Sequence, residues 1–85
     1  MILEKSIVVQ KLCQEIAIIT NCDSDDINPE DNLRNNDIDS MSFLELLLFI
    51  ENEWGVDYIG IGLPLEAQDS IVLLAEHICK SRAGL

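Results

Sequence analysis

Hydrophobic residues recur with helical spacing in three segments of the chain. The first segment runs from about Leu3 to Ile19, and its apolar positions follow steps of three and four: Val9, Leu12, Ile16 and Ile19. This spacing places the four side chains on one face of a helix. We therefore predict an amphipathic helix that ends near Asn21.

The most apolar segment of the chain predicts a second helix from about Ser40 to Trp54. Asp39 precedes it as a suitable N-cap, whose carboxylate the helix dipole stabilises, and Gly55 follows as a typical stop. One stripe of this helix is predicted to be buried: Phe43, Leu46, Leu47, Ile50 and Trp54.

A second apolar stripe lies on the same helix: Met41, Leu44 and Leu48. A helix that is apolar nearly all round is normally buried all round, but a bundle of this size can hardly enclose one of its helices. We expect part of this stripe to be exposed as a docking site. Tight packing of every leucine in the core is the alternative.

A polar stretch, residues 20–39, separates these two helices. It is dominated by Asn, Asp and Ser with Pro29 in the middle, which is typical of a loop. Ile27, Leu33 and Ile38 are the residues expected to hold it to the core. Long connections in small domains are usually functional or disordered, and the position ahead of Ser40 favours a functional loop.

The remainder of the chain predicts one further main helix. Residues 56–64 mix β-branched residues with glycines and are expected to be irregular or extended, and a short helical turn is expected near Pro64. Asp69 or Ser70 should cap the last helix, whose buried face is Ile71, Leu74, Ala75 and Ile78. The prediction is one all-α domain over residues 1–85, a small four-helix bundle of three main helices and a short one, with a long loop between helices 1 and 2.

Length and composition limit what such a domain can do. With 85 residues and 48% hydrophobic content it can form one core but no deep catalytic cleft. No apolar run is long enough to cross a bilayer, and the charged start of the chain is unlike a signal peptide. We expect a cytoplasmic protein without membrane insertion. Three unpaired cysteines, Cys13, Cys22 and Cys79, are expected to be reduced thiols.

Charge indicates the kind of partner. The formal net charge is −11, and Arg34 is the only basic residue between Leu12 and Cys79. Such a surface repels nucleic acid and anionic lipid and attracts proteins with basic patches. A solvated acidic face that serves only solubility is the alternative.

The sequence does not match three motifs that would indicate a calcium site, a dinucleotide site or a serine hydrolase. The stretch beginning at Asp23 lacks the ligands and the glycine of a calcium loop, and no metal site is predicted. Gly60 and Gly62 lack the third glycine of a dinucleotide fingerprint. His77 is the only histidine, and it is expected at the surface or at the core boundary rather than as the base of a Ser40 hydrolase triad. The chain is not expected to be an enzyme.

What remains is a serine presented at the start of an apolar and acidic helix. The run Leu33-Arg34-Asn35-Asn36-Asp37-Ile38-Asp39-Ser40-Met41, followed by a Leu-rich helix with several glutamates, resembles the attachment region of acyl carrier proteins. The resemblance covers nearly the whole chain: a first helix, a long loop, a recognition helix, a short third helix and a closing helix.

The resemblance implies a carrier whose serine, Ser40, is esterified with 4′-phosphopantetheine taken from coenzyme A. Asp39 would help to position Ser40, and the arm would carry acyl groups as thioesters. The implied partners are a phosphopantetheinyl transferase and acyl-loading and acyl-processing enzymes with basic docking patches. The implied docking residues are Met41, Leu44, Glu45, Leu48, Glu51 and Glu53. A monomer is expected, whose core could open to shelter a bound chain.

The chain departs from the family pattern at two places. Asn36 and Asp37 stand where the family usually has a hydrophobic residue and glycine, but Asn and Asp tolerate left-handed backbone angles, so the turn can be kept. Ser42 stands where many fatty-acid carriers have another acid. This difference indicates a specialised set of partners.

Three functional hypotheses follow. The first is a stand-alone acyl carrier protein in fatty acid, polyketide or related specialised biosynthesis. The second is a peptidyl or aminoacyl carrier, whose recognition helix is typically more hydrophobic than that of an acyl carrier. The net charge favours the acyl carrier. The third is an unmodified helical interaction module in which Ser40 is only a helix cap.

Overall fold

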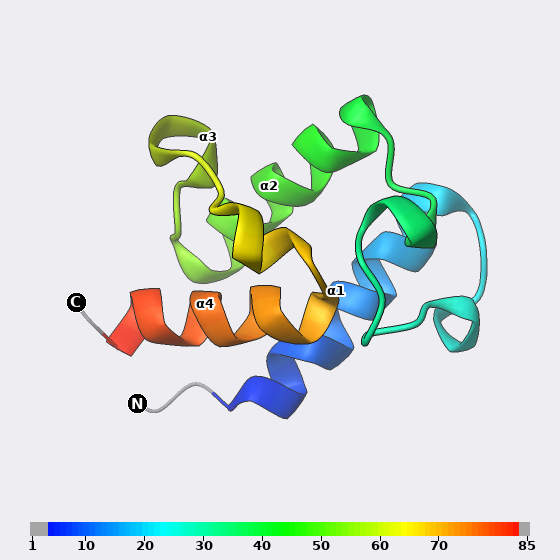
Figure 1. Ribbon diagram of the computed structural model, residues 1–85, viewed down its shortest axis with the longest axis horizontal. Helices are drawn as coiled ribbons and strands as arrows, with labels where there is room; N and C mark the ends of the chain where they lie inside the picture. Colours follow the sequence, from blue (N-terminus) through cyan, green and yellow to red (C-terminus); the bar gives the residue numbers. More distant parts are fainter. Residues whose placement is uncertain (1–3, 84–85) are drawn as a thin grey trace.

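The computed structural model describes residues 4–83, and within that range the chain contains helices and no strands (Figure 1). The α-helices are α1 (Lys5–Thr20), α2 (Ser40–Trp54), α3 (Tyr58–Ile61) and α4 (Ile71–Ala83). Three short 3₁₀ turns complete the elements: η1 (Ser24–Asp26), η2 (Arg34–Asn36) and η3 (Leu65–Gln68). The predicted small helical bundle, with a long loop between the first two helices, is confirmed.

The two long helices at the ends of the chain pack closely together, and α2 packs against α1 on another side. In Figure 1, α4 (orange to red) crosses in front of α1 (blue), while α2 and α3 lie on the opposite side of α4 from the start of α1. An ion pair joins α1 to each neighbour: Lys5 to Glu76 on α4, at 3.0 Å, and Lys11 to Glu53 on α2. Helix α1 therefore packs against both of the other long helices.

The bounds of α2 agree with the prediction at both ends, and α1 ends as predicted. Asn21 takes a left-handed conformation (φ 58°) that terminates α1. The helix begins at Lys5 in the structure, and the predicted start at Leu3 lies outside the described residues. Gly55, also left-handed (φ 74°), ends α2, where a residue without Cβ carries no steric cost.

The buried face of α1 differs by one position from the predicted stripe. Val8 is fully buried, together with Leu12 and Ile16, whereas Val9 and Ile19 are only half-buried. Because α1 packs against both α2 and α4, its deepest row is the set of side chains that lie four residues apart. Val9 and Ile19 still pack against the core, and the prediction missed Val8.

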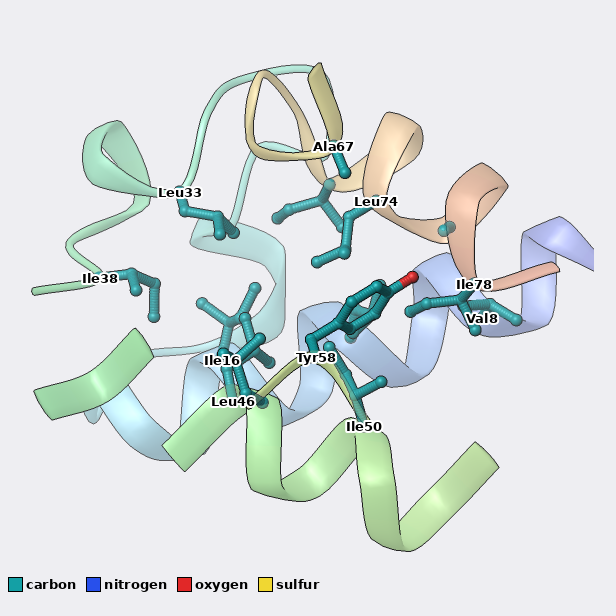
Figure 2. Packing of buried hydrophobic residues seen from close by; sticks show 14 of the residues in the cluster. Val8, Ile16, Leu33, Ile38, Leu46, Ile50, Tyr58, Ala67, Leu74 and Ile78 are labelled. Atoms are coloured by element: carbon teal, nitrogen blue, oxygen red, sulfur yellow. The ribbon is translucent and has the colours of Figure 1, made fainter. Parts of the chain in front are cut away.

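One hydrophobic core joins all the long elements (Figure 2). Leu46 and Ile50 point into it from α2, and Leu74 and Ile78 from α4, with Tyr58 of α3 between the two helices. All four residues of the predicted face of α4 are inaccessible to solvent. The long loop contributes its three predicted anchors, since Ile27, Leu33 and Ile38 are all buried.

The segment after Gly55 contains more regular structure than expected. Tyr58–Ile61 forms the short helix α3, and Asp57 caps it by accepting the backbone N–H of Gly60 through Oδ1 at 2.8 Å. A Cβ atom at Gly60 would lie 2.4 Å from Oδ2 of Asp57, so a larger residue at this position would displace the capping carboxylate. The expectation of an irregular or extended segment was wrong here, whereas a helical turn does follow Pro64.

Two hydrogen bonds fix the start of α4. The Ser70 hydroxyl accepts the backbone N–H of Leu73 at 3.0 Å, which selects Ser70 rather than Asp69 as the cap. The backbone N–H of Val72 donates to the carbonyl of Pro29 at 3.0 Å. The middle of the long loop is thereby bonded to the first turn of α4.

Candidate functional site

Ser40 is the first residue of α2 and is exposed to solvent. Asp39 caps this helix: its Oδ1 accepts the backbone N–H of Ser42 at 2.8 Å, which lowers the pKa of the Asp39 carboxyl below its ordinary value. The Ser40 hydroxyl is therefore not the helix cap. The alternative in which Ser40 serves only as a cap loses its structural basis.

A left-handed residue ahead of Ser40 turns the chain into α2. Asp37 adopts φ 66° and ψ 23°, and the backbone N–H of Ile38 donates to the carbonyl of Leu33 at 3.0 Å to close the turn. Aspartate reaches this region at a lower cost than most residues. The expectation that the turn survives without glycine is confirmed.

Asn36 has a structural role that the sequence did not reveal. Its side chain is buried and makes three hydrogen bonds: it donates to the carbonyls of Asn28 and Asn32, both at 2.9 Å, and accepts the N–H of Asn28 at 2.8 Å. A hydrophobic side chain could make none of these bonds. Asn36 thus holds the two halves of the loop together directly before Ser40.

An open hollow of about 990 Å³ lies beside Ser40. It is bounded by the end of the long loop, the first turn of α2 and the turn η3. Its lining residues are Asn32, Leu33, Arg34, Asp37, Ile38, Asp39, Ser40, Phe43, Leu65, Gln68 and Asp69. The hollow has room for an extended group attached to the serine.

Sequence reasoning had not assigned Arg34, Leu65, Gln68 or Asp69 to the site. Three of these lie far from Ser40 along the chain, in or next to η3, and only the fold brings them to the hollow. Leu65 is 82% exposed, so the lining of the hollow includes a solvent-exposed apolar side chain. Arg34 did carry a sequence signal, because it is the only base in the middle of the chain.

The second apolar stripe of α2 is exposed, as expected. Met41 is 78% exposed, Leu44 50% and Leu48 45%, while Leu46 and Leu47 of the other stripe are buried. Tight packing of every leucine in the core was the alternative, and these exposures exclude it.

The predicted acidic docking residues of α2 divide into two sets. Glu45 and Glu51 are exposed, and by helical spacing they flank the apolar stripe on either side. Glu53 lies on another side of the helix, where it pairs with Lys11 of α1. The structure therefore brings Glu45 and Glu51, but not Glu53, to the edges of the stripe.

No histidine lies beside Ser40 among the described residues to act as a base for its hydroxyl. The only histidine, His77, is half-buried on α4, where its Nδ1 lies 2.6 Å from the Tyr58 hydroxyl, and it does not line the hollow. The prediction of a boundary histidine is confirmed, but its tyrosine partner was not foreseen. Within residues 4–83 no other histidine exists, so no serine hydrolase triad forms around Ser40.

Several other features of the described residues bear on function. No group of three or more histidine, cysteine or acidic side chains within residues 4–83 is arranged to hold a metal ion. In the same range, no helix is long and apolar enough to cross a membrane. The three cysteines are free, and burial raises the pKa of the Cys13 thiol.

These features together define a class of protein. A small helical bundle presents an exposed, unactivated serine at a helix start, with an open hollow on one side and an apolar stripe flanked by acids along the helix. Such a surface suits a protein on which other enzymes act.

The comparison with protein families agrees with this class. The family model for the phosphopantetheine attachment site matches residues 10–78, which is most of the chain. The chain belongs to this family of carrier domains, in which 4′-phosphopantetheine is attached covalently as a prosthetic group. No curated protein and no solved structure gave a match. Carrier domains are non-catalytic and interact with phosphopantetheinyl transferase and with partner enzymes.

The residues of the site fit the prosthetic group. The attachment needs an accessible hydroxyl and space for an extended chain, and Ser40 and the adjoining hollow offer both. The group supplies a terminal thiol, which holds the cargo.

Proposed function

We propose that this chain is an acyl carrier protein and that Ser40 bears its 4′-phosphopantetheine arm. The observation that carries the proposal is the exposed position of Ser40 at the start of α2, beside the hollow and directly after the Asp39 cap. The match to the family model supports the carrier role and leaves the attachment residue and the cargo as our proposal.

The attachment step requires little of the carrier itself. The Ser40 oxygen attacks the pantetheine-bearing phosphorus of coenzyme A, and a new P–O bond forms. The bond from that phosphorus to the bridging pyrophosphate oxygen breaks, and adenosine 3′,5′-bisphosphate leaves with the electron pair. The hydroxyl proton passes to a base of the transferase, which also holds the metal.

The surface of α2 supports acyl carriage and a docking role. Met41, Leu44 and Leu48 offer apolar contact, and Glu45 and Glu51 offer charges for basic residues of a partner. Two copies of this surface would bring like charges together, which supports a monomer. The single core of the described helices supports one domain over residues 1–85.

Intact-mass measurement tests the attachment. The protein is incubated with coenzyme A, magnesium and a broad-specificity phosphopantetheinyl transferase, beside Ser40→Ala and the matched control Ser42→Ala. We expect one phosphopantetheine on the wild type and on Ser42→Ala, and none on Ser40→Ala. Ser42 is a suitable control because its backbone N–H, which remains in the variant, bonds to the Asp39 carboxylate.

The competing outcomes are distinct. Modification of Ser40→Ala would place the arm elsewhere, and an unmodified wild type beside a modified control carrier would favour the interaction module. Loading of the modified protein by acyl-transferring enzymes supports the acyl carrier, whereas loading only by amino-acid-activating enzymes would make it a peptidyl or aminoacyl carrier.

A further inference from the structure

We propose that Arg34 binds the phosphodiester that joins the arm to Ser40 and so holds the base of the arm against the hollow. This inference rests on the proposed attachment at Ser40. It assigns a role to a residue of the long loop that the family match alone does not identify.

The hollow contains one positive charge among several negative ones. Its charged lining residues are Arg34 and three carboxylates, those of Asp37, Asp39 and Asp69. A phosphodiester on Ser40 would add another negative charge at the same place. Among the side chains that line the hollow, only the Arg34 guanidinium carries a positive charge that can offset it.

Arg34 is available for this contact. It is exposed, and neither of the ion pairs found within residues 4–83 includes it: these join Lys5 to Glu76 and Lys11 to Glu53. Its guanidinium also has no hydrogen-bond partner among the side chains of that range. A planar guanidinium with several N–H donors matches the oxygens of a phosphate in a two-pronged contact.

The backbone that carries Arg34 is held in place. Arg34 begins the turn η2, between the buried Leu33 and the buried, hydrogen-bonded Asn36. Asp37, in its left-handed conformation, ends this turn, and the backbone N–H of Asp37 donates to the Arg34 carbonyl at 3.1 Å. Arg34 and Ser40 both line the same hollow on backbone that the fold holds in place, so only the Arg34 side chain has to be ordered when the contact forms.

The carboxylate of Asp39 lies next to the attachment point and would repel the phosphodiester. Asp39 directly precedes Ser40 and is ionised at neutral pH, since the Ser42 N–H lowers the pKa of its carboxyl below the ordinary 3.8. An unopposed phosphodiester would be repelled by Asp39 and would move away from the hollow. Arg34 counters this repulsion and keeps the phosphate on the hollow side of α2.

Nuclear magnetic resonance of the modified protein tests the proposal. The Arg34 Nε–H resonance is compared between the unmodified and modified protein, and the ³¹P signal of the arm is compared between the wild type, Arg34→Gln and Lys11→Gln. The last variant is a matched control, because Lys11 is a partly exposed base that does not line the hollow.

We expect the Arg34 Nε–H resonance to shift on modification. We also expect the ³¹P line of Arg34→Gln to shift and to become narrower, because its phosphate moves more freely, while Lys11→Gln keeps the wild-type signal. Raising the ionic strength from about 0.01 M to about 1 M, which shortens the Debye length from about 30 Å to about 3 Å, should move the wild-type signal toward that of Arg34→Gln.

An unchanged Arg34 resonance on modification, together with the same ³¹P line in the wild type and Arg34→Gln, would overturn the proposal. The phosphate would then be held by other groups or by none. This failure is separate from a failure of the proposed function, because mass measurement shows beforehand whether Ser40 has been modified.

Discussion

At the scale of single residues, the approach to Ser40 depends on one aspartate in a conformation that glycine adopts more easily. Asp37 has φ 66°, and none of its side-chain atoms forms a hydrogen bond within the described residues. The side chain therefore contributes little that would offset its backbone cost. The chain keeps the turn without the residue that the family usually has there.

Asp37→Gly is expected to increase the free energy of unfolding by up to about 1 kcal/mol, because glycine has no Cβ to disfavour this conformation. Asp37→Ala should lower the free energy of unfolding, and Asp37→Asn, which removes the charge but tolerates the same angles, should change it little. Urea denaturation measures all three. A glycine variant less stable than the wild type would show that the aspartate makes a contact that compensates for its backbone.

The Asp39 cap predicts a dependence on pH. Because the Ser42 N–H lowers the pKa of Asp39 in the folded state below its ordinary value of 3.8, the carboxylate stabilises the start of α2 above that value. This stabilisation is lost as the pH falls through the folded-state pKa. Titration of the Asp39 carboxyl carbon and the Ser42 amide by NMR should give one shared midpoint below 3.8.

The asparagine variant serves as the control for that titration. Asp39→Asn retains an oxygen acceptor for the Ser42 N–H but does not titrate, so the Ser42 amide should lose its acid-dependent shift. A wild-type midpoint at or above the ordinary value would contradict a charged cap.

At the scale of elements, α2 has one buried apolar face and one exposed apolar face. Leu46 is fully buried, whereas Leu48, two positions further along the same helix, is 45% exposed. The two leucines have the same chemistry and the same helix propensity. They form a matched pair that separates stability from docking.

Leu46→Ala is expected to lower the free energy of unfolding by about 2 to 5 kcal/mol, because it leaves a cavity in the core. Leu48→Ala should change it by less than about 1 kcal/mol and should instead reduce kcat/KM of the transferase for this carrier. Chemical denaturation and transferase kinetics on both variants check the pair. Equal losses of stability would show that α2 has no free face.

The elements also show which parts of the fold can be predicted from sequence. The bounds of α2 were predictable because Asp39 and Gly55 are local signals that act on their own neighbours. The helix α3 was not, because four residues are too few to show a period and Gly60 is usually a helix breaker. Its stability comes from the Asp57 cap and from the burial of Tyr58, which only the fold shows.

In the candidate site, too, features set by neighbouring residues were predictable, and features set by the fold were not. Ser40, its cap and the exposed stripe could be predicted, because they lie within a few residues of one another. The hollow could not, because η3 lies more than twenty residues further along the chain. The full burial of Val8 was also not predictable, since two adjacent valines fit almost the same pattern and packing of α1 against α2 and α4 decides which of them lies deeper.

At the scale of the whole molecule, charge is the dominant surface property. The formal net charge is −11, and the two ion pairs found in the described residues are partly exposed, so they contribute little. Repulsion among the carboxylates therefore opposes the compact state. The charges that we propose to attract basic partners therefore reduce the stability of the isolated protein.

Added sodium chloride is expected to raise the Tm, because screening weakens this repulsion more than it weakens the two ion pairs. The effect should be largest between about 0.01 M and 0.15 M salt, where the Debye length falls from about 30 Å to about 8 Å. Calorimetry at matched pH measures it. A Tm that stays constant or falls over this range would show that the acidic groups are already compensated in the fold.

The hydrogen bond from Val72 to the Pro29 carbonyl has a consequence for dynamics. If the middle of the loop lifts away, the Val72 N–H loses its acceptor and is freed for exchange, even while α4 stays folded. The Val72 amide then exchanges with deuterium at a rate set by loop opening. One amide in the last helix thereby reports on the mobility of the segment that presents Ser40.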